Sequence, residues 1–128
     1  MTDSSSAKAV LAIGIDPAYV DLSGMPGFTA DMVRSYLQTQ IDRVREFGHD
    51  VDTCLIDTGA TAKQVVETAL RARRYDCVVI GAGLREPLEL LMLFEAVINL
   101  VHTLAPSANI AFNSSPTDTA EAANRWLA

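Results

Sequence analysis

Asp16, Glu95 and His102 are the side chains whose types and spacing could perform acid–base chemistry. Asp16 directly follows a long apolar run, so we expect it at the exposed end of a buried strand. Glu95, Asn99 and His102 recur at spacings of four and three, which places them on one stripe of a helix. A carboxylate or amide that orients an imidazole prepares it to exchange protons near neutral pH. A solvated helix face explains the same stripe, and both interpretations stay open.

Gly81 and Gly83 end a second apolar run, and Arg85 follows them. Backbone amides at such a turn can cradle an anion, and a guanidinium adds positive charge. The segment resembles the start of a dinucleotide-binding fingerprint, although Glu86 stands where that fingerprint has its last glycine. We therefore expect a small anionic or polar ligand here, without predicting a particular cofactor. The alternative is that the glycines only permit a tight turn.

Thr58 lies in a segment, LIDTGA at 55–60, that resembles the active-site signature of retroviral-type aspartic proteases. This resemblance implies an all-β homodimer whose paired aspartates share a proton. The helical periodicity of 61–74 and 87–104 does not suit such a fold. The TGAT at 58–61 also resembles part of the flavodoxin phosphate loop, so Thr58 is a candidate for ligand binding. The alternative is that these polar residues cap the following helix.

Four apolar runs alternate with four segments of helical periodicity. We expect strands at 8–16, 51–57, 77–81 and 109–112, and helices at 29–47, 61–74, 87–104 and 117–127. The periodicity places Val33, Leu37 and Val65 among the inward-facing residues. Strands that alternate with helices imply right-handed crossovers. The expected fold is therefore α/β and flavodoxin-like, a three-layer, four-stranded parallel sheet of order 2-1-3-4 with helices on both faces.

In open parallel sheets, ligands bind beyond the carboxyl ends of the strands, at the point where the strand order reverses. That point lies here between the first and third strands. Asp16 and Tyr19 begin the connection after the first strand, and Asn113 follows the fourth strand. The connection at 17–28 is longer than such a turn needs, which is typical of a lid or binding loop. An arm at a protein interface is the alternative.

The composition restricts the classes of partner. A length of 128 residues suits one domain, which we expect at 8–128 after a disordered or extended stretch at 1–7. The formal net charge is −6 and no run of Lys or Arg is longer than the pair Arg73-Arg74, so no nucleic-acid partner is expected.

The chain begins without a signal-peptide pattern, and its longest apolar stretch is interrupted by polar residues. We therefore expect no membrane partner and a cytoplasmic location. Cys54 and Cys77 both lie in predicted strands, which indicates buried, reduced thiols and no metal site.

As a whole, the chain is similar to small bacterial flavodoxin-like or receiver-like domains of unassigned function. Phosphate-accepting receivers have an acidic cluster after the first strand, an aspartate after the third and a lysine after the fifth. Here Asp16 stands alone, Gly81 and Ala82 occupy the acceptor region, and no fifth strand is predicted. The resemblance therefore implies the fold and does not imply phosphate transfer.

The predicted helix at 87–104 is apolar around most of its circumference. Its residues Leu88, Leu91 and Met92 lie outside the stripe that faces the sheet. Such a helix usually buries a second surface, so we expect a homodimer or higher homo-oligomer in which it forms the interface. The alternative is that neighbouring helices of the same chain cover it.

Three functional classes follow from these features. The first is a ligand-binding or regulatory module with its site at the point of strand-order reversal, which self-associates through 87–104. The second is a small enzyme whose acid–base site lies at the carboxyl ends of the first and third strands. The third is a protein–protein interaction module with a receiver-like fold.

Overall fold

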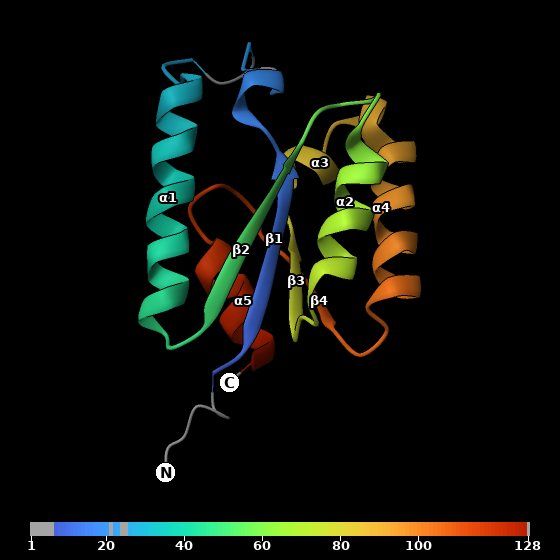
Figure 1. Cartoon of the computed structure of the whole chain (residues 1–128). Coiled ribbons are helices and arrows are strands. Elements are labelled where there is room, and N and C mark those ends of the chain that lie inside the picture. Colours follow the sequence, from blue (N-terminus) through green and yellow to red (C-terminus); the bar gives the residue numbers. More distant parts are fainter. Residues whose placement is uncertain (1–6, 21, 24–25, 128) are drawn as a thin grey trace.

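A four-stranded sheet forms the centre of the computed structural model, which describes residues 7–20, 22–23 and 26–127 (Figure 1). The strands are β1 (Ala9–Ile15), β2 (Asp50–Ile56), β3 (Cys77–Ile80) and β4 (Asn109–Phe112). All neighbouring pairs are parallel, and the order is β2-β1-β3-β4. The predicted strand order is therefore confirmed.

Helices cover both faces of this sheet (Figure 1). One face packs against α1 (Ala30–Glu46) and α5 (Thr119–Leu127), and the other against α2 (Ala62–Ala72) and α4 (Leu91–Leu104). Three shorter helices lie in the connections: η2 (Pro17–Tyr19), α3 (Ala82–Arg85) and η3 (Leu88–Leu90). Three layers with this strand order are the flavodoxin-like arrangement, which confirms the predicted fold class.

The sequence of β1 explains why both faces are covered. Successive side chains of a strand point to opposite faces. Val10 and Ala12 accordingly belong to the core beneath α1 and α5, while Leu11 and Ile13 belong to the core beneath α2 and α4. A strand that is apolar at every position is stable only when both of its faces are buried.

The predicted continuous helix at 87–104 is wrong at its beginning. Residues 82–85 already form α3, the chain then leaves the helical conformation at Pro87, and η3 and α4 follow. Pro87 has ψ 125°, which is extended rather than helical. Proline has no N–H to donate to the preceding turn, so it separates α3 from α4 instead of opening one long helix.

Three residues differ from their predicted burial. Val65 is 38% exposed, because the buried stripe of α2 consists of Ala62, Val66 and Leu70 at spacings of four. Val33 and Leu37 are only half-buried, although Ile41 and Val44 of the same helix are buried as the periodicity indicates. The N-terminal half of α1 therefore packs less closely on the sheet than its C-terminal half.

The two cysteines are free and buried. Cys54 belongs to the core beneath α2 and α4, whereas Cys77 belongs to the core beneath α1 and α5, so the sheet separates them. Burial raises the pKa of each thiol to about 11. Both side chains are therefore thiols at neutral pH and act as small apolar residues.

Within the described ranges, no helix is both long enough and apolar enough to cross a membrane. The stretch at 1–7 that was predicted to be disordered or extended lies almost wholly outside the described residues, which begin at Ala7.

Candidate functional site

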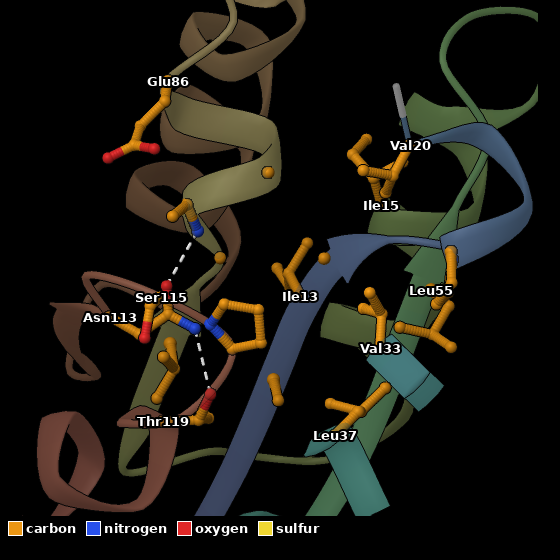
Figure 2. Close-up of a pocket in the computed structure, with 18 of the residues that line it drawn as sticks. Ile13, Ile15, Val20, Val33, Leu37, Leu55, Glu86, Asn113, Ser115 and Thr119 are labelled. Atoms are coloured by element: carbon orange, nitrogen blue, oxygen red, sulfur yellow. Dashed lines mark hydrogen bonds between the residues drawn. The ribbon is translucent and has the colours of Figure 1, made fainter. Parts of the chain in front are cut away.

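A cavity of about 330 Å³ lies at the carboxyl edge of the sheet (Figure 2). It is bordered by the ends of β1 and β3, which are neighbours although β2 comes between them in the chain. This is the point at which the strand order reverses, where ligands bind in sheets of this kind. We refer to it as the switch-point cavity.

The lining of the switch-point cavity comes from five parts of the chain and is mostly aliphatic. It consists of Ala12–Ile15 of β1, Pro17, Val20 and Leu22 after it, Val33 and Leu37 of α1 with Leu55 of β2, Val79, Gly81–Gly83 and Glu86 around α3, and Asn113–Pro116 with Thr119 before α5. Figure 2 shows the aliphatic side chains of Val33, Leu37 and Leu55 on one side of the cavity. The polar side chains of Asn113, Ser115 and Thr119 lie on the other side. The cavity therefore has an apolar wall and a polar wall.

Small residues of β1 leave room for this cavity. Ala12 faces the α1 and α5 side, and Gly14, two residues further on, faces the same side. A Cβ atom at Gly14 would meet nothing within 4 Å. In addition, α5 has only 9 residues against 17 in α1, so it covers less of the strand length. The cavity is the space that remains between the first residue of α5 and the carboxyl edge of the sheet.

A buried amide holds the polar wall together. The side-chain Oδ1 of Asn113 accepts from the backbone N–H of Ala82 at 2.7 Å. Its Nδ2 donates to the hydroxyl of Thr119 at 2.9 Å. Asn113 thus connects the first residue of α3 with the first residue of α5, and its orientation is fixed because one partner is a donor and the other an acceptor.

A second buried amide supports the same region from α1. The side-chain Oε1 of Gln40 accepts from the backbone N–H of Ala120 at 2.9 Å. This bond satisfies one of the N–H groups that the first turn of a helix leaves without an intrahelical partner. Gln40, Asn113 and Thr119, the buried polar residues of the described chain, are therefore all hydrogen-bonded.

Asp118 organises the loop between β4 and α5. Its carboxylate accepts from the backbone N–H groups of Ser114 and Ser115, at 2.9 Å and 3.1 Å, and from the Ser114 hydroxyl at 2.6 Å. Partial burial disfavours the charged carboxylate, but these hydrogen bonds outweigh it and lower the pKa of Asp118. The ionised carboxylate therefore holds the loop that forms the polar wall.

Three of the predicted ligand-binding residues, Gly81, Gly83 and Asn113, line the switch-point cavity. Three of the backbone N–H groups near the two glycines are already used within the protein. That of Gly81 donates to Ile13 O at 2.9 Å, that of Ala82 donates to Asn113, and that of Arg85 donates to Gly81 O at 3.2 Å. These three N–H groups are therefore not free to bind an anion, whereas the Gly83 N–H has no hydrogen-bond partner among the described residues.

Arg85 does not line the cavity. Its guanidinium carbon lies 5.4 Å from the centre of the Phe112 ring, and its Nη2 lies 3.8 Å from a Glu86 carboxylate oxygen. The side chain is therefore directed toward the β4 edge of the sheet. Glu86 is the only charged residue among those described that line the cavity.

Asp16 and Tyr19 lie beside the switch-point cavity rather than on its wall. The Asp16 carboxylate accepts from the backbone N–H of Ala18 at 2.9 Å, which caps η2, and it pairs with Arg34 at 3.2 Å. Tyr19 is exposed. Asp16 thus joins the end of β1 to α1, while the residue after η2, Val20, contributes to the cavity wall.

Thr58 is exposed in the turn after β2 and does not line the cavity. The neighbouring Asp57 carboxylate accepts from the Gly59 N–H at 3.0 Å and from the Thr61 hydroxyl at 2.8 Å. These bonds lower the pKa of Asp57, with the Gly59 N–H as the largest cause. The segment therefore forms a turn that leads into α2, although its N-cap residue, Thr61, makes no side-chain capping hydrogen bond.

Glu95 and His102 are both exposed on α4. The Asn99 side chain donates to the backbone carbonyl of Glu95 at 2.9 Å rather than to His102. α4 packs on the face of the sheet opposite to α1, and His102 lies near its end, at the amino edge of the strands (Figure 1). The structure therefore does not bring His102 together with Asp16.

The chemistry of the switch-point cavity follows from this lining. Its described lining offers aliphatic contacts, no cation, and hydroxyl groups on one wall. The Thr119 hydroxyl accepts the Asn113 bond, and within the described residues it donates none, so it can donate to a ligand. The described part of the chain also contains no cluster of three or more His, Cys, Asp or Glu that could hold a metal ion.

Several residues of the apolar wall did not emerge as site residues from the sequence. Gly14, Leu22, Val33 and Leu37 line the cavity, yet the helical periodicity had assigned Val33 and Leu37 to the core. A signal was present in β1, where Ala12 and Gly14 are two small residues on one face of an otherwise large apolar strand.

Comparison of the sequence with protein-family models found no match, and comparison with curated protein sequences found none.

Proposed function

We propose that this protein is a binding module for a small, uncharged and largely apolar molecule in the switch-point cavity. The observation that carries the proposal is an aliphatic cavity at the point of strand-order reversal, with hydroxyl groups on one wall. Ligand pockets in proteins are typically apolar and contain a few placed polar groups that fix orientation.

The volume supports a ligand of limited size. At about 330 Å³, the cavity lies at the small end of the range of about 300–1,000 Å³ that is usual for ligand pockets. A single ring or a short branched chain fits this space. The Thr119 hydroxyl favours a hydrogen-bond acceptor, such as a carbonyl oxygen, on the side of the ligand that meets the polar wall.

The small anionic ligand expected from the sequence is less well supported by this lining. A bound anion needs a cation or free N–H groups. Arg85 stacks on Phe112, and the N–H groups of Gly81 and Ala82 have partners in the protein. The Glu86 carboxylate at the rim would repel a negative charge.

The hypothesis that the protein is an enzyme receives less support than the hypothesis that it is a binding module. It required His102 and Asp16 to meet in one cavity, and they lie near opposite edges of the sheet. A receiver-like regulatory role and a cytoplasmic location remain proposals that rest on the sequence.

The proposal is tested by filling the cavity. Cyclohexanone, an uncharged ring with one acceptor oxygen, should bind the wild-type protein in a calorimetric titration and raise its thermal midpoint. Gly14→Val should abolish this binding, because the new side chain enters the open space at Gly14. The same variant should be at least as stable as the wild type, since glycine within a strand costs about 0.5–1 kcal/mol.

Gly59→Val is the matched control. A Cβ atom at Gly59 also meets nothing within 4 Å, but this glycine lies outside the cavity. Its variant should bind cyclohexanone as the wild type does. Binding that survives in Gly14→Val, or a wild type that binds inorganic phosphate and not cyclohexanone, would contradict the proposal.

A further inference from the structure

The two edges of the sheet differ in chemistry. β2 carries Asp50 and Asp52, which pair with Arg73 at 3.6 Å and 3.3 Å, so that edge is charged. Charged side chains are a common means of keeping a sheet edge from pairing with another chain. β4, at the other edge, carries Ile110 and Phe112, and within the described residues no strand pairs with its outer side. The charges near this edge, Arg85 over the Phe112 ring and Arg125 on the Phe112 carbonyl, lie at the Phe112 end of the strand.

Backbone groups on the outer side of β4 point away from the sheet. The N–H of Asn109 donates to Asp76 O at 2.9 Å, which directs this residue toward β3. Because successive residues of a strand point their N–H and C=O groups to opposite sides, Ile110 and Phe112 direct theirs away from β3. Arg125 donates to the Phe112 carbonyl at 3.1 Å. Ile110 therefore presents its N–H and C=O at the centre of the edge.

The flank of α4 continues this surface. The rings of Phe94 and Phe112 lie 6.1 Å apart, which joins the helix to the strand edge. Leu91 and Ile98, three residues before and four after Phe94, share its face. Leu91 is 46% exposed. We call this surface, formed by Leu91, Phe94, Ile98, Ile110 and Phe112, the β4–α4 face.

We propose that a second copy of this chain binds the β4–α4 face about a two-fold axis. The two β4 strands pair antiparallel at Ile110 and join the sheets, and the two α4 helices pack antiparallel beside them. Such an interface uses the same patch on both protomers. Since stable interfaces bury at least about 1,000 Å², a four-residue strand alone is insufficient and α4 has to contribute.

The positions of Glu95 and His102 on α4 favour a second copy as the occupant. Glu95 and His102 lie two turns apart on the same side of α4, and their midpoint falls between Ile98 and Asn99. In an antiparallel pair centred there, Glu95 faces the partner subunit's His102, and His102 faces the partner subunit's Glu95. An acidic and a basic group placed symmetrically about one point match themselves under a two-fold rotation.

The strand and the helix give the same position for the axis. From the contact between Phe94 and Phe112, four residues along α4 advance about 6 Å to Ile98. Two residues back along β4 cover about 6.6 Å to Ile110. Ile110 is also the centre at which two strands would exchange both N–H···O bonds. The centre of the strand pair and the centre of the helix pair therefore lie at the same position along the strand direction.

Charge reversal tests this proposal on the full chain. Sedimentation from about 1 μM to about 500 μM should show a wild-type dimer. Glu95→Lys places Lys against the partner subunit's His102, and His102→Glu places Glu against the partner subunit's Glu95. Each single change should weaken the dimer about tenfold or more. The double variant places Lys opposite the partner subunit's Glu and should return the dissociation constant to within about threefold of the wild type.

Glu46→Lys makes the same change of charge on α1, away from the β4–α4 face, and should leave the dimer intact. Both substituted residues of α4 are exposed, so their variants should keep the wild-type circular dichroism spectrum. A monomeric wild type overturns the proposal and leaves the face to a partner of another kind. A dimer that neither single change weakens, or single losses that the double variant does not restore, also overturns it.

Discussion

At the scale of single residues, the candidate site depends on the buried amide of Asn113. Its two hydrogen bonds reach the beginnings of α3 and α5, which both contribute to the switch-point cavity. The side-chain amide accepts a hydrogen bond from one partner and donates one to the other, which no apolar side chain can do. Its function in the structure is therefore to keep the polar wall in position.

Replacement of this amide should destabilise the protein. Asn113→Leu leaves the Ala82 N–H and the Thr119 hydroxyl without their partner, and we expect it to cost about 2–3 kcal/mol of unfolding free energy. Chemical denaturation measures this loss. Ser114→Ala, which removes a hydroxyl from an exposed hydrogen bond, should cost less than about 1 kcal/mol. Equal losses in the two variants would contradict the assigned function of Asn113.

Asp118 makes the stability dependent on pH. Its pKa is lower in the folded protein than the unfolded value of about 3.9, so folding is favoured by its ionised form. This contribution is fully present above the unfolded pKa and is lost as the pH falls through the folded pKa. Asp118→Asn should therefore lower the unfolding free energy near pH 6 and reduce its decline between about pH 5 and about pH 3. An unchanged decline would show that the hydrogen bonds do not depend on the charge.

At the scale of the elements, the end of α1 requires a particular backbone conformation. Gly48 has φ +93°, and its N–H donates to Arg45 O at 2.9 Å. Residues with a Cβ atom rarely adopt this conformation. The glycine allows α1 to end and β2 to begin two residues later.

Gly48→Ala should reduce the unfolding free energy by about 1 kcal/mol. Gly59→Ala is the control, because its φ is not positive and a Cβ atom there meets nothing within 4 Å. The control should be neutral or slightly stabilising. A Gly48→Ala variant as stable as the wild type, in the same denaturation experiment, would argue against strain at this turn.

Several elements could be predicted from the sequence because their signals are local. The apolar run of β1, the Thr29 side chain that caps α1 and the glycine that ends it each act within a few residues. The break at Pro87 was less accessible. Proline is also common at the first position of a helix, so the sequence alone does not show that Pro87 stays extended between α3 and η3.

At the scale of the whole molecule, the fold was predictable and the cavity was not. Alternating strands and helices determine a parallel sheet, and the strand order then fixes where a ligand can bind. The cavity depends on how far α5 extends along β3 and β4, which is a contact between distant segments. The direction of Arg85 likewise depends on Phe112 beside it, which no local pattern in the sequence indicates.

The central claim is that the switch-point cavity binds a small uncharged molecule. Its most direct test is a methyl NMR titration of the wild-type protein with cyclohexanone. We expect saturable shifts of the Val33 and Leu37 methyl groups, which line the cavity, and none for Leu91 on the opposite layer. Shifts that are absent, or that appear equally at Leu91, would contradict it.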